Sequence, residues 1–91
     1  MEVRWSPSAE ADFIHIIQYV REQNATAADR VARTILDGIV MLEKFPLSGR
    51  PGRVLGTREI VFTPLPFLAV YRVRENILEV LRVMHGAQRW P

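Results

Sequence analysis

The sequence contains no cysteine, so disulfides, thiol catalysis and cysteine-based zinc sites are all excluded. Long apolar runs are missing as well. The longest stretch without a charged residue, 60–71, has 12 residues and two prolines, which is too little to span a bilayer. The N-terminal segment has acidic residues early and no apolar core, so no signal peptide is expected. These absences favour a cytoplasmic protein that does not act in a membrane.

The chain is short, and its 91 residues predict a single domain that covers 1–91. A domain of this size buries only about 60–65% of the surface that its unfolded chain exposes. Little core is then left for an enclosed cavity, so we expect any functional site on an open surface. Hydrophobic residues make up 48% and charged residues 24%, which is typical of a folded globular protein and not of a disordered one.

Lysine is almost absent, since Lys44 stands against eleven arginines. The charge also differs between the halves: residues 1–45 carry a net −2 and residues 46–91 a net +4. A basic C-terminal half could meet nucleic acid or an acidic protein partner. The alternative is that these arginines are merely solvated on the faces of strands.

The N-terminal half predicts two helices that form an antiparallel hairpin over about 7–45. Ser6 is expected to cap the first helix and Pro7 to occupy its first position, and an apolar stripe then continues for about three turns. The first helix should end near Asn24, a residue that tolerates the left-handed conformation. Thr26 to Asp29 has the form of a capping box, which predicts a second helix from Ala27 to about Lys44.

The C-terminal half predicts strands. The order β-α-α-β-β-β gives an α+β fold, in which the helical hairpin packs on a small antiparallel sheet. The other face of that sheet should be open or partly covered by the tail. The predicted elements are an N-terminal strand at 2–5, a loop at 46–56, a meander at about 57–84 with strands 57–62, 67–73 and 77–84, and a tail at 85–91.

The last hairpin allows a prediction of register. A two-residue loop at 75–76 places Arg72 opposite Glu79 as a cross-strand ion pair. The same register places Ala69 opposite Arg82, which leaves Arg82 without an acidic partner and makes it the better functional candidate. A change of one residue in the loop would move these side chains to the other face.

Most catalytic patterns are missing from the chain. No glycine-rich loop lies between a strand and a helix, and His15 and His85 without a third ligand make no zinc site. His15 is expected on the surface. His85 could act as an acid or base beside arginines near a phosphodiester, or it could simply end a strand and bond to the backbone. Trp90 could stack on a base, anchor an interface or close the core.

Together, several motifs give the chain its resemblance to the RelE/ParE superfamily, the small toxins of bacterial type II toxin–antitoxin, or plasmid-stabilisation, modules. The resemblance covers nearly the whole chain, and it implies the hairpin-on-sheet fold and a partner antitoxin. We expect a ribbon-helix-helix antitoxin with an acidic tail, through which the complex would bind operator DNA. The motifs are Trp5-Ser6-Pro7, Phe45-Pro46-Leu47-Ser48-Gly49-Arg50-Pro51-Gly52, Gly56-Thr57-Arg58-Glu59, Val70-Tyr71-Arg72-Val73 and Leu81-Arg82-Val83-Met84-His85-Gly86-Ala87-Gln88-Arg89-Trp90-Pro91.

RelE-like members cut mRNA in the ribosome, and their pattern is only half present here. Arg58 matches a basic position on the first meander strand, and His85 matches a C-terminal histidine of some nucleases. Leu68 stands where that pattern has an arginine, and Ile60 stands at its second basic position. The alternative function is therefore a metal-independent, ribosome-dependent endoribonuclease with Arg58 and His85 as catalytic residues.

The closing residues, 85–91, are more similar to the ParE branch, whose members inhibit DNA gyrase without cutting RNA. The resemblance therefore favours a non-catalytic toxin that inhibits growth by binding gyrase and needs no cofactor or metal. Its target-binding residues would be Arg58, Arg82, His85, Arg89 and Trp90. A third hypothesis is a chain that has lost toxicity and only binds its antitoxin.

Overall fold

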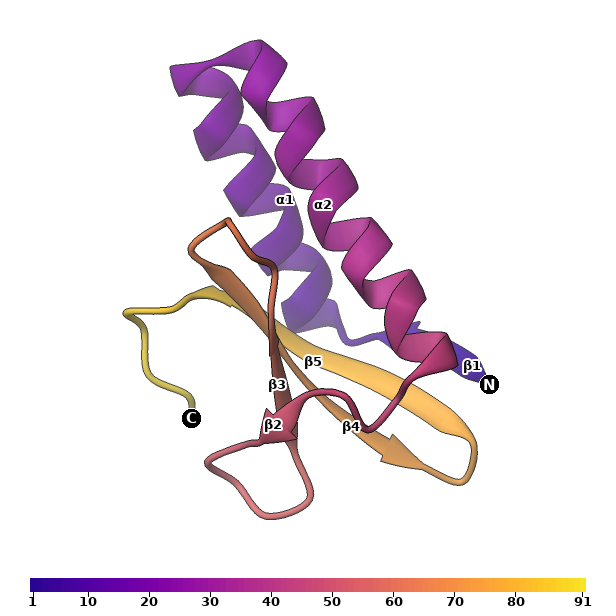
Figure 1. Cartoon of the computed structure of the whole chain (residues 1–91). Coiled ribbons are helices and arrows are strands. Elements are labelled where there is room, and N and C mark those ends of the chain that lie inside the picture. The colour runs from indigo at the N-terminus through magenta and orange to yellow at the C-terminus, as the bar shows by residue number, and fades with distance from the viewer.

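Two helices lie across one face of a mixed five-stranded sheet in the computed structural model, which describes residues 1–91 (Figure 1). The strand order is β1-β5-β4-β3-β2, so the central strands are β5, β4 and β3. The predicted α+β class and helical hairpin are confirmed. The elements are β1 (Glu2–Trp5), α1 (Pro7–Gln23), α2 (Ala25–Lys44), β2 (Arg50–Pro51), β3 (Arg58–Val61), β4 (Phe67–Arg74) and β5 (Ile77–His85).

The start of α1 is as the sequence predicts. The Ser6 hydroxyl accepts a hydrogen bond from the Ala9 N–H at 3.0 Å, and Pro7 occupies the first turn, where its missing N–H costs nothing. At the same end of the helical hairpin, α2 ends at Lys44 with Phe45 as its C-cap, directly before Pro46, which is also as expected.

The junction between the helices differs from the prediction, because a single residue, Asn24, serves both helix ends. Its φ of −166° is extended and not left-handed, and its Oδ1 accepts a hydrogen bond from the Ala27 N–H at 3.1 Å. The capping box at Thr26 is therefore wrong. The second helix begins at Ala25, and Thr26 already lies in its first turn because Asn24 satisfies the free N–H groups first.

The N-terminal strand also departs from the expected antiparallel sheet, since β1 pairs with β5 in parallel. Val3 lies beside Leu78 and Trp5 beside Val80, so the apolar residues of both strands join one core. The Ser6 N–H donates to the Val80 carbonyl at 2.9 Å. This bond anchors the end of β1 beside Val80, where α1 begins.

The loop between α2 and β3 contains one strand that the sequence did not predict. Residues Arg50 and Pro51 form β2, which lies antiparallel to the first half of β3. A two-residue strand carries no hydrophobic period, so no pattern in the sequence could indicate it.

The β4–β5 hairpin has the predicted two-residue turn, in which Glu75 and Asn76 take φ values of 51° and 64°. Positive φ at both positions gives a primed turn that matches the twist of the strands. Arg72 lies opposite Glu79, and its Nε reaches Glu79 Oε1 at 2.8 Å. The predicted cross-strand ion pair is confirmed.

Further along the same hairpin, a β-bulge shifts the register between Val70 and Tyr71. Leu81 is the extra residue, so Val70 faces Arg82 and Ala69 faces Val83. The predicted pairing of Ala69 with Arg82 is therefore wrong. A bulge places two residues of one strand opposite one of the other, and nothing in the local sequence marks its position.

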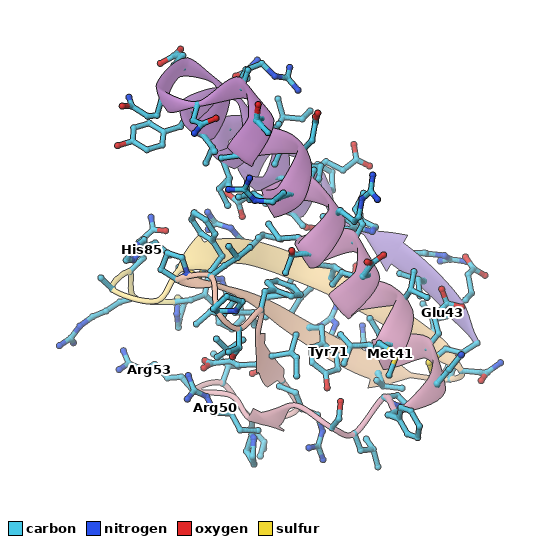
Figure 2. All side chains as sticks on the ribbon, turned by 45° about the horizontal axis from the view of Figure 1, so that its top comes forward. Met41, Glu43, Arg50, Arg53, Tyr71 and His85 are labelled. Atoms are coloured by element: carbon cyan, nitrogen blue, oxygen red, sulfur yellow. The ribbon has the colours of Figure 1, made fainter.

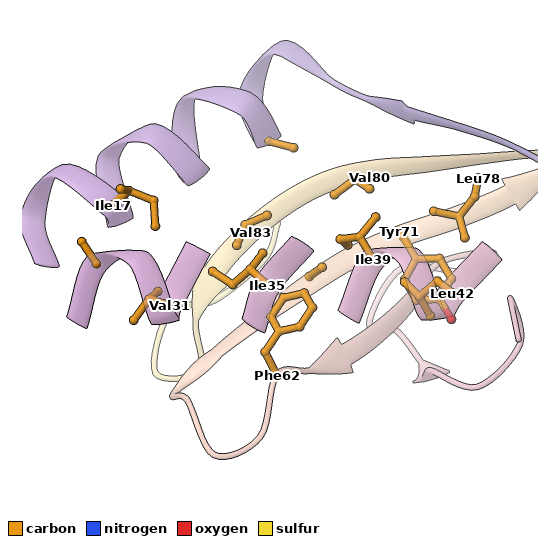
Figure 3. Close-up of a cluster of buried hydrophobic side chains, with 13 residues drawn as sticks. Ile17, Val31, Ile35, Ile39, Leu42, Phe62, Tyr71, Leu78, Val80 and Val83 are labelled. Atoms are coloured by element: carbon orange, nitrogen blue, oxygen red, sulfur yellow. The ribbon is translucent and has the colours of Figure 1, made fainter. Parts of the chain in front are cut away.

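The main core lies between the helical hairpin and the sheet, as Figure 3 shows for its buried side chains. Tyr71, Ile35 and Leu78 are fully buried there. Helix α2 approaches the sheet closely at Gly38, where an added Cβ would lie 2.5 Å from Cδ1 of Phe62. None of the helices has the length and apolarity needed to cross a membrane.

A smaller cluster lies on the opposite face of the sheet, because successive residues of β4 point to alternate faces. Leu68, Val70 and Met84 form it, and Trp90 of the tail packs against them. The expected partial cover of this face by the tail is confirmed. Trp90 thus closes a small second core while it stays half-buried.

Candidate functional site

Arg82 is held by an acidic partner on α1. Its Nε and Nη2 donate to the two carboxylate oxygens of Asp12 at 2.7 and 2.9 Å. This hydrogen bond raises the pKa of Arg82 above its ordinary value, although burial opposes the shift. The prediction that Arg82 lacks an acidic partner is wrong, because the bulge and the path of α1 bring together residues 70 positions apart.

The same carboxylate supports the edge of β5. Beyond Trp5 this edge has no partner strand, and Asp12 Oδ2 accepts a hydrogen bond from the Val83 N–H at 3.0 Å. The Ser6 hydroxyl donates to the Leu81 carbonyl at 2.8 Å. The first turns of α1 therefore satisfy backbone groups that a further strand would otherwise satisfy.

Arg58 is bound to the loop that follows α2. Its Nη1 donates to the carbonyls of Leu47 and Gly49 at 3.2 and 2.8 Å. Directly opposite on β4, the buried Tyr71 hydroxyl donates to the Pro46 carbonyl and accepts from the Gly49 N–H, at 2.8 and 3.0 Å. The side chains of Arg58 and Tyr71 thus fix this loop, and Nη1 of Arg58 is occupied by these bonds.

His85 ends β5 and is tied to the tail. The Ala87 N–H donates to its Nδ1 at 3.0 Å, and its own backbone N–H donates to Gln88 Oε1 at 2.8 Å. The ring meets Phe67 edge to face, with centroids 5.9 Å apart. The expected alternative of a strand-end residue bonded to the backbone is confirmed. Because Nδ1 accepts a hydrogen bond, the neutral ring carries its proton on Nε2, which has no protein partner.

Arg58 and His85, the pair predicted for an endonuclease, do not share a site. Arg58 lies opposite Tyr71 and His85 opposite Phe67, so they are four residues apart along β4, or about 13 Å, and on opposite sides of it. Figure 2 shows His85 and Tyr71 at well-separated places on the sheet. The groove that His85 lines does not include Arg58.

His85 does share a groove of about 580 Å³ with the exposed His15. The groove lies between α1 and the end of β5. No group of three metal-binding side chains comes together in the domain. The residues that line the groove are Asp12, His15, Ile16, Tyr19, Phe67, Val83, His85 and Gln88.

Arg89 and Trp90 lie together on the face opposite the helices. They line a depression of about 160 Å³ with Arg50 and Arg53, which come from the loop before β3 (Figure 2). Arg50 pairs with Glu59, whereas Arg53 and Arg89 have no acidic side chain within ion-pair distance. Two unpaired guanidinium groups beside an indole suit an acidic partner. We call Arg50, Arg53, Arg89 and Trp90 the arginine face.

Sequence reasoning named Arg89 and Trp90 but missed Arg50 and Arg53. Both lie in the loop, whose path over the sheet is set by the bonds of Tyr71 and Arg58 to its backbone. The only signal is the run Arg50-Pro51-Gly52-Arg53, in which two arginines flank a turn pair.

The fold and these surfaces can now be compared with known proteins. The model of the family described as "ParE toxin of type II toxin-antitoxin system, parDE" matches residues 3–90. The chain belongs to this family of toxins. As a member, it is expected to have a cognate antitoxin, and the resemblance inferred from the sequence is confirmed.

Similar proteins agree with this assignment. "Putative toxin Y4kP" of Sinorhizobium fredii is 37% identical over 98% of this chain and 92% of its own length. "Toxin RelE2" of Caulobacter vibrioides is 29% identical over 96% of this chain and 97% of its own. The solved structure titled "Chromosomal ParDE TA system from P. aeruginosa" contains a chain with a TM-score of 0.85 and 25% identity, which covers 93% of this toxin and 95% of that chain.

Proposed function

We propose that this toxin inhibits growth by binding DNA gyrase and that it does not cut RNA. The observation that carries the proposal is at Leu68, where a ribosomal nuclease of the superfamily would have an arginine. Leu68 is 9% exposed and packs in the small core under Trp90. One preorganised charge-stabilising donor is typically worth about 3–4 kcal/mol in a transition state, and here that donor is replaced by an apolar contact.

The contacts with the target are assigned to two adjoining surfaces. Arg89 and Trp90 of the arginine face would touch gyrase directly, as would His85, which lies at the end of β5 in the groove beside α1. Arg58 and Arg82 would contribute through position, since Arg58 holds the loop that carries Arg50 and Arg53, and Arg82 fixes the end of β5. An open surface of this kind supports binding better than it supports an enclosed reaction.

Supercoiling of relaxed plasmid by purified gyrase tests the proposal. Wild-type toxin in molar excess should abolish the supercoiled product, and adding antitoxin should restore it. Unchanged supercoiling at excess toxin would contradict the proposal.

A second candidate is cleavage of translated mRNA, favoured by His85, whose Nε2 faces solvent without a protein partner. An endonuclease would use this nitrogen as acid or base, but Arg58, its predicted partner, lies four residues away along β4 and on its other side. Primer extension on a translated transcript, with wild-type toxin and His85→Ala, distinguishes the two. Cuts that appear with wild type and vanish with the variant would establish the nuclease instead.

The antitoxin is proposed to be a ribbon-helix-helix protein with an acidic tail that carries the complex to operator DNA. The net +4 of residues 46–91 and the unpaired Arg53 and Arg89 support an acidic partner segment. Operator binding by the complex but not by the isolated toxin, measured by gel shift, is the expected result. Binding by the toxin alone would contradict it.

A further inference from the structure

One large apolar side chain of the domain lies wholly in solvent. Leu55 is 100% exposed, whereas the next most exposed hydrophobic side chains, Tyr19 and Leu47, are each 65% exposed. Removing a leucine side chain from water is favourable, so the full exposure of Leu55 leaves that free energy available to a binding partner. A single exposed leucine is ordinary by itself, and its significance here lies in the loop that carries it.

Leu55 occupies the corner of a tight turn between β2 and β3. The Thr57 N–H donates to the Val54 carbonyl at 3.0 Å, which closes the turn around Leu55 and Gly56. Gly56 has a φ of 85°, as the third position of a type II turn requires. Leu55 is then the second residue of the turn, and its side chain extends from the corner into solvent. We call residues 53–56 the tip loop.

Hydrogen bonds tie the base of the tip loop together. The Gly52 N–H donates to the Thr57 carbonyl at 2.8 Å, and the Thr57 hydroxyl donates to the Val54 carbonyl. Thr57 is only 8% exposed, and a Cβ added to Gly52 would collide with its hydroxyl. The backbone that carries Leu55 is therefore ordered before any partner binds, which reduces the entropy that binding costs.

The tip loop adjoins the arginine face. Arg53 belongs to both, and it lies two residues before Leu55. In Figure 1 the loop between β2 and β3 projects beyond the sheet and away from the two helices, and Figure 2 shows Arg50 and Arg53 on this side. Arg53 and Arg89 have no acidic side chain within ion-pair distance. A protruding apolar side chain thus lies beside guanidinium groups that are free to bind an acidic surface.

We propose that Leu55 inserts into an apolar pocket of the target protein and that the arginine face binds acidic residues around this pocket. Protein interfaces commonly have this anatomy, in which an apolar centre is surrounded by a polar rim. The charges select and orient the partner, while burial of the leucine supplies affinity. The inference rests on the proposed binding of gyrase, and it names the apolar anchor of that complex.

Other partners fit the tip loop less well. Duplex DNA has no apolar pocket, so a leucine enters it only by separating stacked base pairs, which costs free energy. A membrane would hold the loop weakly, because even one myristoyl chain gives only marginal binding and a leucine is much smaller. A second copy of the toxin would receive the loop head to tail, an arrangement that builds open chains unless the rotation closes.

Leu55→Ser tests the anchor in the supercoiling assay with purified gyrase. The replaced side chain is fully exposed, so the melting temperature of the toxin should be nearly unchanged. Half inhibition should need at least about tenfold more of this variant than of wild type. Leu55→Met keeps the apolar volume and should inhibit within about threefold of wild type. Equal inhibition by wild type and Leu55→Ser would overturn the inference.

The absence of cysteine permits a second test that reports on the side chain directly. Leu55→Cys introduces a single thiol, which can carry a fluorophore that responds to the polarity of its surroundings. Gln23→Cys, at the exposed end of α1, is the matched control. Gyrase should shift the emission of the label at position 55 to the blue and leave that at position 23 unchanged. An unshifted label at position 55, on toxin that still inhibits supercoiling, would overturn the inference.

The outcomes separate this inference from the proposal on which it rests. Wild-type toxin that leaves supercoiling intact would overturn the gyrase proposal together with the inference. Inhibition by wild type that Leu55→Ser fully retains would overturn the anchor alone. A blue shift of the label at position 55 with duplex DNA alone, with vesicles of anionic lipid or with rising concentrations of unlabelled toxin would assign the tip loop to that partner and overturn the inference.

Discussion

Replacing Asp12 with alanine should destabilise the domain strongly, because one carboxylate supports both Arg82 and the edge of β5. The variant loses two bonds to the guanidinium and leaves the Val83 N–H without a partner. The Asp12 side chain is 17% exposed and that of Arg82 36%, so solvent screens the ion pair only in part. Hydrogen bonds to charged groups contribute about 1.5–3 kcal/mol, and an orphaned N–H costs about 1–3 kcal/mol. Because these contributions are not additive, we expect a loss of about 2–3 kcal/mol.

Urea unfolding followed by circular dichroism measures this loss, and the melting temperature should fall by about 10–20 °C for a domain of this size. Asp12→Asn can still accept from the Val83 N–H and should lose about half as much. Glu2→Ala breaks the fully exposed pair with Arg4 and should leave the unfolding midpoint unchanged. A loss below about 0.5 kcal/mol for Asp12→Ala would refute the reasoning, since it would equal an ordinary surface substitution.

Four further substitutions test three local features by urea unfolding. Tyr71→Phe removes the hydroxyl that bonds twice to the loop after α2 and should cost about 1–2 kcal/mol; no change would show that the loop is held otherwise. Gly38→Ala would normally stabilise a helix by about 1 kcal/mol, but its Cβ meets the ring of Phe62, so a net loss of about 1–3 kcal/mol is expected, and a gain would contradict the close packing. Asn24→Ala should lower the free energy of unfolding by about 1 kcal/mol, while Thr26→Ala should change it very little. The reverse order would show that Thr26 caps the helix, as the capping-box prediction had it.

The sequence was sufficient to predict the helical hairpin and the central strands. The helical spacing of the apolar residues indicates which face of each helix is buried. Ser6-Pro7 and Phe45-Pro46 mark helix boundaries by local chemistry alone. The turn at 75–76 was equally local, since two residues must take positive φ there. Each of these features depends on neighbours in the chain.

The errors concern choices between local signals or contacts between distant residues. Asn24 and Thr26 are both good caps, and the sequence does not say which one accepts first. The bulge at Leu81 moved Arg82 by one position relative to β4, and α1 then brought Asp12 to it from 70 residues away. A site that depends on register and on helix placement cannot be derived from residue types alone.

The same limit explains the candidate site. The composition indicated a basic C-terminal half, but the arginine face exists only because the loop folds over the sheet and places Arg50 and Arg53 near Arg89. Arg58 was singled out for its charge, and the structure places one arm of its guanidinium on loop carbonyls. The sequence indicated a basic surface and named only some of the residues that line the depression.

Inhibition of gyrase supercoiling by a matched pair of arginine variants tests the central claim most directly. Arg89→Ala removes one charge from the arginine face, and Arg74→Ala removes one exposed charge from the turn end of the β4–β5 hairpin, away from that face. If the toxin binds gyrase through the arginine face, Arg89→Ala should need about tenfold more protein for half inhibition, whereas Arg74→Ala should match wild type. Equal inhibition by both variants, or no inhibition by wild type, would contradict the account.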